Sequence, residues 1–389
     1  MATTADIVVI GLGAAGAATA RHLTRRGARV IAFDRHHPPH DRGSSHGGSR
    51  ITRQAVGEGD DLVPLALRSH QLWRELEAES GESLMLTTGA LIIGRPDEGG
   101  DHTGKRDFVR RTIEAARRFA IPHEVVSADE VSRRFPMFRL EESETAYFEP
   151  GGGVLFPERC VAVQIDLARR LGAEIRVGET VLDLRDEGSA VRVITDRGDY
   201  LAGQAVVAAG AWAGGLVGGP IAEKLRTYRQ VMHWFAPVDA AAFSPSRMPV
   251  FIWMHGAAAE QWFYGFPILP GQAGVKIADE RFDTPLPSPD AQSQVIDPAA
   301  AAQMWARHVA GRVTGVTDQC VKSVACLYTM APESRFLVGR DRAHDRVILV
   351  SACSGHGFKH SAAIGELVAD LAGGAAPPLL APFDPFADP

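Results

Sequence analysis

The hydrophobic pattern of the chain opens with two short apolar runs separated by a helical stretch. Residues 7–10 and 29–33 form these runs, and the stretch between them stops at Gly27. Short apolar runs are typical of strands, and glycine commonly ends a helix. The pattern therefore predicts a strand–helix–strand unit at the start of the chain.

Further along, apolar residues at helical spacing alternate with strand-length runs. Helices are predicted over 62–80, 108–120, 128–135 and 159–171, with Ser127 or Asp129 capping the third. Strands are predicted over 87–94, 173–177, 181–184, 191–194 and 205–208, whereas the Gly- and Pro-rich residues 147–157 predict an irregular crossing. The last of these strands extends the first sheet and closes at Gly210 and Trp212.

The second half of the chain begins with strand-like segments that no helix separates. They cover 228–236, 251–254, 261–266 and 275–279, which predicts a second, largely antiparallel sheet. A helix over 298–310 follows, with Asp297 as its N-cap and Pro298 at its first position. A buried strand over 347–350 and a helix over 358–371 come next, and the Pro-rich tail, 375–389, is expected to wrap the surface.

These elements predict an α/β fold of two domains. A Rossmann-like nucleotide-binding domain is expected over 1–86, 155–225 and 325–389, so that it is discontinuous in sequence. Residues 87–154 and 226–324 are expected to form an α+β substrate domain around the mixed, largely antiparallel sheet. With 389 residues, of which 45% are hydrophobic and 23% charged, the chain has ample apolar material for both.

Composition excludes several classes of function. A net charge of −6 and a pI near 6.2 give no general attraction for nucleic acid or for an anionic membrane. No stretch approaches the ~20 apolar residues that span a bilayer, and the N-terminus lacks the basic region of a signal peptide. The four cysteines show no CxxC spacing, so neither a zinc site nor a disulfide framework is indicated. The predicted compartment is the cytoplasm.

The first turn carries a glycine fingerprint. Gly11 permits a tight turn, Gly13 lets the backbone approach a pyrophosphate, and Gly16 lets the helix lie close to the strand. The helix N-terminus offers free N–H groups to phosphates. Asp34 ends the second strand, where a carboxylate accepts from ribose hydroxyls and repels the 2′-phosphate of NADP. The segment predicts an ADP-containing dinucleotide and leaves FAD and NAD open.

Three further segments contain residues that could bind a cofactor or take part in a reaction. Residues 354–359 read Ser-Gly-His-Gly-Phe-Lys between a strand and the last helix, 326–329 read Cys-Leu-Tyr-Thr, and 46–53 form an early loop. A strand that enters glycines and then a helix directs free N–H groups at a ligand above the sheet edge. Lys359 lies in the first turn of that helix, where a cation either reaches water or meets a negative ligand.

With these pieces the chain resembles the D-amino-acid-oxidase-like flavoproteins, and among them the monomeric sarcosine oxidase and N-methyltryptophan oxidase group. The resemblance runs nearly end to end and is densest at 43–73, 264–267, 326–330 and 354–359. These blocks are much more specific than the glycine fingerprint. The resemblance implies that the Rossmann-like domain binds FAD and that the protein is a monomer.

The resemblance also implies how FAD is held. Cys326 is expected to carry it covalently, through a thioether to the 8α-methyl carbon of the flavin. Arg50 is expected to face the flavin or its phosphates. The other residues expected to contact FAD are Gly11, Gly13, Gly16, Asp34, Arg35, Ser45, Val181, Gly210, Trp212, Gly355, His356, Gly357, Phe358 and Lys359.

The catalytic side chains follow from the same resemblance. Arg53 and Lys359 match the two cations that hold the substrate carboxylate, and an arginine fork can bind both of its oxygens. Lys276 matches the lysine that activates dioxygen, because a fixed positive charge stabilises developing superoxide. The remaining residues expected in the pocket are Tyr264, Tyr328 and, near the flavin and the substrate amine, His46.

The chain departs from the resemblance at one position. Four residues after Lys276, close relatives carry a histidine, whereas this chain has Glu280. A carboxylate in the pocket is expected to favour a cationic or larger polar substrate over sarcosine. The segment between Tyr264 and Lys276 is also one residue longer than the resemblance implies, which leaves the local register open.

The sequence therefore predicts an FAD-dependent oxidase of N-methyl or cyclic secondary α-amino acids. The amine is oxidised to an imine that hydrolyses, and dioxygen is reduced to hydrogen peroxide. The predicted partners are the small amino acid or amine substrate and O2, and no metal is expected. Two alternatives stay open: a dehydrogenase that passes electrons to a partner, and a flavin monooxygenase, which the lack of a second nucleotide fingerprint disfavours.

Overall fold

The computed structural model describes residues 3–96, 107–258 and 260–387, and its first sheet has a parallel centre. Strand β1 pairs in parallel with β2 and β12, β2 with β9, and β12 with β19. The strands of this sheet are β1 (Thr3–Ile10), β2 (Val30–Asp34), β9 (Glu174–Val177), β10 (Val181–Asp186), β11 (Val191–Thr195), β12 (Asp199–Val207), β18 (Leu337–Arg340) and β19 (Val347–Ser351). The antiparallel strands β10, β11 and β18 extend it.

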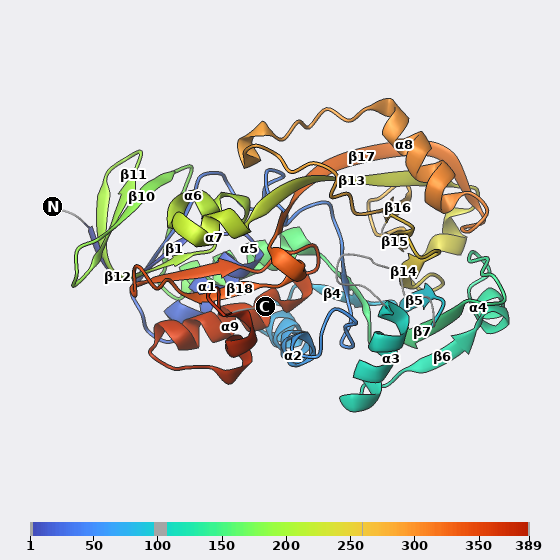
Figure 1. Cartoon of the computed structure of the whole chain (residues 1–389), viewed down its shortest axis with the longest axis horizontal. Helices are drawn as coiled ribbons and strands as arrows, with labels where there is room; N and C mark the ends of the chain where they lie inside the picture. Colours follow the sequence, from blue (N-terminus) through green and yellow to red (C-terminus); the bar gives the residue numbers. More distant parts are fainter. Residues whose placement is uncertain (1–2, 97–106, 259, 388–389) are drawn as a thin grey trace.

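Helices cover both faces of this sheet, as a doubly wound fold requires. On one face α1 packs against α5 and α9, and α2 packs beside α9; on the other lie α6 and α7 (Figure 1). These helices are α1 (Ala14–Arg25), α2 (Leu62–Ser80), α5 (Pro157–Arg170), α6 (Ala213–Val217), α7 (Gly219–Lys224) and α9 (Ser361–Ala372). The close approach of α1 to α9 depends on Gly365, where a Cβ would lie 2.4 Å from the Cβ of Ala18.

The second sheet lies at the other end of the molecule and is antiparallel except where β14 runs parallel to β5 (Figure 1). In spatial order its strands are β17 (Val316–Met330), β13 (Arg226–Pro237), β16 (Val275–Ala278), β15 (Trp262–Phe266), β14 (Val250–Met254), β5 (Ala90–Gly94), β7 (Thr145–Glu149) and β6 (Glu124–Ser127). Helices α3 (Phe108–Arg118), α4 (Ala128–Arg134) and α8 (Pro298–Met304) accompany it. The predicted fold class, a Rossmann-like sheet with a mixed, largely antiparallel second sheet, is confirmed.

A small third sheet of β3 (Arg50–Thr52), β4 (Met85–Thr87) and β8 (Gly153–Leu155) carries the end of the early loop. Because β3 is hydrogen-bonded to β8, it holds the residues just before Arg53 in an extended conformation. The exact division of the chain into two domains stays a prediction.

Several element boundaries differ from the sequence prediction. The expected strand over 87–94 breaks into β4 and β5 at Gly89, whose φ is +77°. Residues 147–157 were expected to be irregular but contribute β7, β8 and the start of α5, and the 15-residue strand β17 was not predicted at all.

The two C-terminal helices are shorter than predicted. The helix capped by Asp297 becomes a π-turn at Trp305–Val309, and the last helix begins as a 3-10 turn at Phe358–His360 before α9. The Asp297 side chain accepts from the Ala299 N–H at 2.8 Å, as expected of an N-cap. In the tail, Leu380 and Phe383 are buried, while residues 388–389 lie outside the described part.

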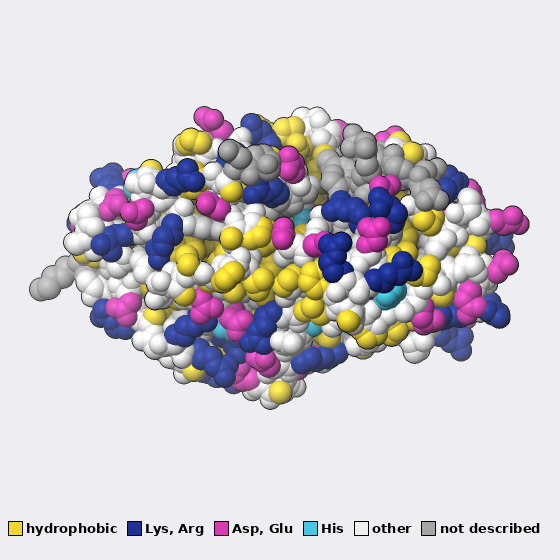
Figure 2. Space-filling view, turned by 60° about the horizontal axis from the view of Figure 1, so that its bottom comes forward, with side chains coloured by type: hydrophobic (Ala, Val, Ile, Leu, Met, Phe, Trp, Pro, Cys, Tyr) yellow, Lys and Arg dark blue, Asp and Glu magenta, His cyan; other side chains and the backbone are white. Residues whose placement is uncertain are grey.

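On the face shown in Figure 2, basic and acidic side chains are interspersed, and apolar side chains gather across the middle. Neither sign of charge dominates this face. Within residues 3–96, 107–258 and 260–387, no helix has the length and apolar character needed to traverse a bilayer.

A glycine-to-alanine change tests the predicted contact between α1 and the turn before it. A Cβ on Gly16 would lie 1.8 Å from the carbonyl oxygen of Gly11, so that Gly16→Ala is expected to destabilise the protein by about 1–3 kcal/mol. Gly151→Ala is the matched control, because a Cβ there has no neighbour within 4 Å. Chemical denaturation measures both, and equal stabilities of the two variants would contradict the contact.

Candidate active site

A cavity of about 380 Å³ runs from the turn after β1 to Lys276 in the second sheet. Its walls include residues at the carboxyl ends of β1, β2, β12 and β19, together with residues of β15, β16 and β17. The carboxyl ends of parallel strands are where ligands bind in open α/β sheets. The two large sheets therefore enclose one elongated site.

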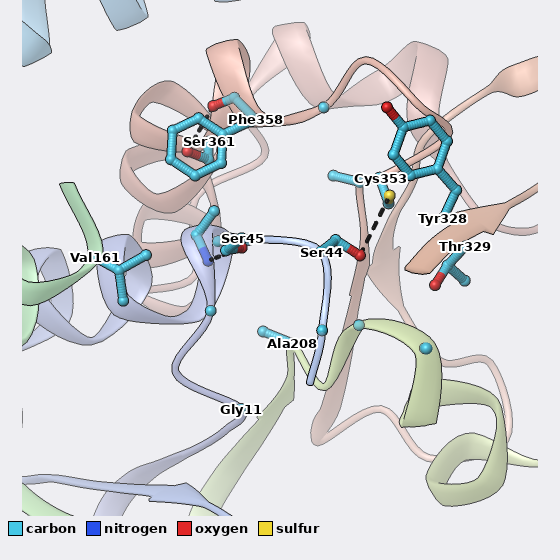
Figure 3. Close-up of a pocket in the computed structure, with 18 of the residues that line it drawn as sticks. Gly11, Ser44, Ser45, Val161, Ala208, Tyr328, Thr329, Cys353, Phe358 and Ser361 are labelled. Atoms are coloured by element: carbon cyan, nitrogen blue, oxygen red, sulfur yellow. Dashed lines mark hydrogen bonds between the residues drawn. The ribbon is translucent and has the colours of Figure 1, made fainter. Parts of the chain in front are cut away.

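The turn between β1 and α1 forms the first end of the cavity. Gly11 has a φ of +92°, and a Cβ there would lie 2.5 Å from the carbonyl oxygen of Ala208. Gly13 is the N-cap of α1 and gives it no side-chain cap, while the Ala14 N–H donates to Ser45 Oγ at 3.2 Å (Figure 3). The positive end of the helix dipole thus faces the cavity, which suits a phosphate group.

Asp34 stands beside this turn as a buried carboxylate. It accepts from the backbone N–H groups of Leu12 at 2.9 Å and His36 at 2.8 Å. Burial acts to raise the pKa of Asp34, but the His40 side chain and these two N–H groups outweigh it and hold the pKa below its ordinary value. The side chain therefore stays ionised and can accept from hydroxyl groups at the cavity wall.

Arg35 and Trp212 form a stacked pair that closes the same end of the cavity. The sequence predicted both residues but not the carboxylate that joins them. The Arg35 guanidinium lies 5.2 Å from the centroid of the Trp212 ring. Asp290 accepts from both side chains, from Trp212 Nε1 at 3.0 Å and from Arg35 at 3.2 Å. Asp290 belongs to the long connection between β16 and α8, which crosses the top of the molecule in Figure 1. No sequence signal pointed to Asp290, because its partners lie far away in the chain.

The middle of the cavity is lined by the early loop and by β17. Ser44 Oγ donates to the carbonyl oxygen of Leu327 at 2.5 Å and lies 3.9 Å from Cys353 Sγ, with Tyr328 beside them (Figure 3). Arg50 donates to the carbonyl oxygens of Ser44 and Ser49. The loop and the strand are thus joined at the cavity wall.

Lys276 projects from β16 into the far end of the cavity and is fully buried. Its ammonium donates to the carbonyl oxygens of Gly47 at 2.9 Å and Ser49 at 3.1 Å, and to Ser49 Oγ at 3.0 Å. Burial lowers the pKa of Lys276 well below its ordinary value, and the nearby Arg50 lowers it further. These three acceptors fix the position of the Lys276 ammonium.

Arg53 and Lys359 meet at a shared carboxylate, that of Glu58. The Arg53 guanidinium donates to both Glu58 oxygens at 2.8 Å, and Lys359 Nζ lies 3.6 Å from Glu58 Oε1. All three side chains line the cavity and are at most 9% exposed. The structure therefore brings the two predicted cations together around a carboxylate. Sequence reasoning missed Glu58, although the block Gly57-Glu58-Gly59 was among the matching segments.

A second buried carboxylate holds Arg53 in place. Glu149 accepts from the backbone N–H groups of Gln54 at 2.7 Å and Ala55 at 3.1 Å, and from the Tyr147 hydroxyl at 2.7 Å. Arg53 in turn donates to the carbonyl oxygen of Ala55 at 2.5 Å. This network fixes the backbone that follows Arg53, so that its guanidinium is pre-oriented.

Two tyrosines and Glu280 also line the cavity. The hydroxyl oxygens of Tyr264 and Tyr328 lie 3.3 Å apart. Burial raises the pKa of both phenols, and the Glu280 carboxylate raises it further, so both are neutral at pH 7. A Cβ on Gly355 would lie 3.0 Å from Glu280 Oε1 and 3.3 Å from the Tyr328 ring. Glu280 therefore enters the pocket.

Three of the predicted site residues lie behind the cavity wall. Gly16 is buried against Gly11 within the turn. Cys326 is 1% exposed and packs with Tyr328 and Cys353; burial raises its pKa to about 11, while Arg50 and Lys276 favour its thiolate. His46 is also buried, and burial lowers its pKa to about 4.

The other predicted residues reach the cavity itself. Those predicted to contact cofactor are Gly11, Gly13, Asp34, Arg35, Ser45, Arg50, Val181, Gly210, Trp212, Gly355, His356, Gly357, Phe358 and Lys359. Those predicted as catalytic are Arg53, Tyr264, Lys276, Glu280 and Tyr328, and Lys359 belongs to both sets. Their location is thus established, whereas their roles remain predictions.

Comparison with known proteins identifies a matching family and close relatives. The family described as FAD dependent oxidoreductase (DAO) matches residues 6–371. Monomeric sarcosine oxidase of Streptomyces avermitilis is 37% identical over 96% of this chain and 94% of its own length. N-methyl-L-tryptophan oxidase of Salmonella agona is 29% identical over 97% of both chains.

Solved structures agree with this fold. NikD, described as an unusual amino acid oxidase essential for nikkomycin biosynthesis, superposes with a TM-score of 0.85 at 26% identity, covering 98% of each chain. L-proline dehydrogenase from P. horikoshii superposes with a TM-score of 0.82 at 21% identity, covering 99% of this chain and 98% of its own. The second likeness establishes the fold alone.

Proposed function

Because the chain belongs to the family of FAD-dependent oxidoreductases, we propose that it is an oxidase of N-methyl or cyclic secondary α-amino acids. The relatives named sarcosine oxidase and N-methyltryptophan oxidase support this reaction class. The observation that carries the proposal is the pairing of Arg53 and Lys359 around one carboxylate inside the cavity that also contains Lys276.

The residues at the first end of the cavity are of the kinds that bind the ADP half of FAD. The first end offers the α1 N-terminus for a pyrophosphate, Asp34 for ribose hydroxyls and the Arg35–Trp212 pair for a planar base. Close approach of a ligand to the turn is possible because Gly11 and Gly13 carry no side chain. When bound, FAD accepts two electrons from the substrate and delivers them to dioxygen.

The substrate carboxylate is assigned to the position that Glu58 occupies. A guanidinium fork and an ammonium already converge there, and both are buried, so an incoming carboxylate exchanges with Glu58 for the same hydrogen bonds. Tyr264 and Tyr328 line the same cavity, and we assign to them the exclusion of water from the reacting amine. Orientation and water exclusion are therefore the main contributions of this chain to catalysis.

The overall reaction balances as an oxidation by dioxygen. The secondary amine loses two electrons and two protons to become an imine, which water hydrolyses to an amine and a carbonyl compound. Dioxygen gains the two electrons and two protons and becomes hydrogen peroxide. An N-methyl substrate that is oxidised at its methyl carbon also releases formaldehyde.

Aerobic incubation with N-methyl amino acids and proline analogues tests the proposal. We expect hydrogen peroxide with oxygen present, and loss of the yellow flavin absorbance when substrate is added without oxygen. Absence of both signals with every compound would contradict the proposal. Bleaching by NADPH without substrate would instead support a flavin monooxygenase.

We further propose that FAD is attached covalently through Cys326. The thioether would replace the S–H bond of Cys326 and one C–H bond of the 8α-methyl group; the two electrons released would reduce the flavin, and dioxygen would reoxidise it. Arg50 and Lys276 favour the thiolate that such attachment requires, although burial opposes it. Acid-precipitated wild-type protein is expected to remain yellow, whereas Cys326→Ser is expected to give a colourless precipitate. Cys353→Ser is the matched control, since Cys353 lines the cavity and packs beside Cys326. Mass spectrometry of the flavin-bearing peptide decides between the two thiols.

A further inference from the structure

A single peptide group lies between the buried Lys276 ammonium and a carboxylate that is not part of the cavity wall. This peptide joins Gly47 to Gly48 in the early loop. Its carbonyl oxygen accepts from Lys276 Nζ at 2.9 Å, and its N–H donates to Glu158 Oε1 at 2.9 Å. Because the C=O and N–H of a trans peptide point in opposite directions, Lys276 and Glu158 lie on opposite sides of it.

The loop needs two glycines to present this peptide. Gly47 has a φ of +92° and Gly48 a φ of +77°, both in the left-handed region that favours glycine. A Cβ on Gly47 would lie 2.7 Å from Met232 Cε, and a Cβ on Gly48 would lie 2.8 Å from Gln272 Nε2. Two adjacent residues without side chains therefore allow the peptide to fit between the ammonium and the carboxylate.

Glu158 belongs to the first turn of α5, directly after Pro157. A carboxylate is favourable there, because the helix dipole places partial positive charge at the N-terminus. The Glu158 side chain is half-buried and does not line the cavity. Its influence on Lys276 therefore passes through the Gly47–Gly48 peptide and through its charge, and not through contact with a ligand in the cavity.

The charged and titratable groups that act on Lys276 come from several elements packed around it: Arg50 on β3, Lys322 and Cys326 on β17, His46 in the early loop and Glu158 on α5. Burial lowers the pKa of Lys276 most, and the two neighbouring cations lower it further, whereas Glu158 raises it. The Cys326 thiol is neutral at pH 7, because burial raises its pKa to about 11. Burial likewise keeps His46 neutral by lowering its pKa to about 4. Glu158 thus supplies negative charge that offsets the two cations.

We propose that Glu158 is a positioning residue for Lys276: its carboxylate polarises the Gly47–Gly48 peptide, whose carbonyl oxygen holds the ammonium and favours its charged form. A hydrogen bond to one end of an amide strengthens the bond at the other end, and a charged partner makes each bond stronger. This inference rests on the proposed function, in which the charge of Lys276 promotes the reaction with dioxygen.

Glu158→Gln tests the inference, because glutamine keeps the length of the side chain and an oxygen that can accept from Gly48 but removes the charge. The flavoprotein is reduced with stoichiometric dithionite and mixed with oxygen over a range of pH. At a pH below the titration of Lys276, the variant is expected to react at the wild-type rate. At the pH where the wild-type rate is half its maximum, the variant is expected to be about three- to tenfold slower, since its ammonium loses the proton at a lower pH.

Nuclear magnetic resonance follows the titration of Lys276 without any oxygen reaction. The chain contains five lysines, so protein labelled with 13C at lysine gives few side-chain signals. The signal of Lys276 is the one that is absent from Lys276→Met. We expect its titration midpoint to lie at a lower pH in Glu158→Gln than in the wild type. Glu158→Asp keeps the charge and is expected to give a midpoint between the two.

Glu77→Gln is the matched control. Glu77 also accepts from backbone N–H groups of a loop, those of Leu84 at 2.8 Å and Met85 at 2.9 Å, but this loop does not line the cavity. Its variant is expected to keep the wild-type pH profile and the wild-type midpoint of Lys276.

The two measurements separate failure of this inference from failure of the proposed function. An unchanged midpoint of Lys276 in Glu158→Gln, or an oxygen reaction slowed equally at every pH, overturns the inference. If the midpoint shifts as expected but Lys276→Met reacts with oxygen at the wild-type rate, the coupling of Glu158 to Lys276 stands, and the role of Lys276 in the proposed function fails.

Discussion

Replacing Lys276 with methionine is expected to slow the reaction of the reduced enzyme with dioxygen by about 10²–10³-fold, the usual effect of removing one preorganised electrostatic donor. The ammonium is held by three oxygen acceptors and lies 4.7 Å from the Phe266 ring and 5.4 Å from the Trp234 ring. Its charge is therefore fixed inside the cavity, where the proposed function assigns it the stabilisation of developing superoxide. Stopped-flow mixing of the reduced enzyme with oxygen measures the rate.

A matched lysine serves as the control. Lys322 Nζ also lies near the Trp234 ring, 5.0 Å from its centroid, but it is exposed and does not line the cavity. Lys322→Met is expected to react with oxygen at the wild-type rate, and both variants are expected to be reduced by substrate normally. An unchanged oxygen reaction in Lys276→Met would favour the dehydrogenase alternative, in which a partner takes the electrons.

The oxygen reaction is also expected to depend on pH. Burial holds the pKa of Lys276 well below its ordinary value, so the ammonium loses its proton at a lower pH than an exposed lysine does. The rate of reoxidation is therefore expected to fall as pH rises through this lowered pKa. Lys276→Met should show a slow rate without this step. A wild-type rate that stays constant up to the ordinary lysine pKa would contradict a role for the charge.

Local patterns were sufficient to predict the first end of the site. Gly11, Gly13 and Asp34 lie within one strand–helix–strand unit, so their spacing along the chain determines their spacing in space. The meeting of Arg53 with Lys359 is different. These residues are separated by most of the chain, and only the resemblance to a known family indicated that they share a ligand.

The sequence did not indicate which residue would pair with each buried charged side chain. Glu58 lies in a loop whose orientation depends on Glu149, and Asp290 reaches Trp212 through a long connection without regular pattern. The C-terminal tail is a further example, because Arg335 donates to the carbonyl oxygen of Pro382 and the Phe336 ring packs against that of Phe383. The strand β17 was missed because much of its first half is exposed and lacks an alternating apolar face.

Replacing Arg53 with methionine is expected to weaken binding of an α-amino acid substrate by about 2–5 kcal/mol, or roughly 30- to several thousand-fold. The variant removes the fork that donates to both carboxylate oxygens and leaves Lys359 as the remaining cation at the site. Methionine also removes the contact between the guanidinium and the Phe108 ring, whose centroid lies 5.1 Å from Arg53 Cζ, but it keeps an unbranched apolar side chain in the place of the Arg53 stem. Anaerobic titration of the flavin spectrum with substrate gives the dissociation constant.

Glu58→Gln provides a contrast of opposite sign. Glu58 now occupies the Arg53 fork, so an incoming carboxylate competes with its charge. Without that charge, an unreactive carboxylate such as methoxyacetate is expected to bind more tightly than to the wild type, whereas Arg53→Met is expected to bind it more weakly. An N-methyl amine without a carboxyl group should bind similarly to all three proteins. If Arg53→Met weakens binding of that amine as much as binding of the amino acid, Arg53 acts by maintaining the shape of the pocket and not by binding the carboxylate.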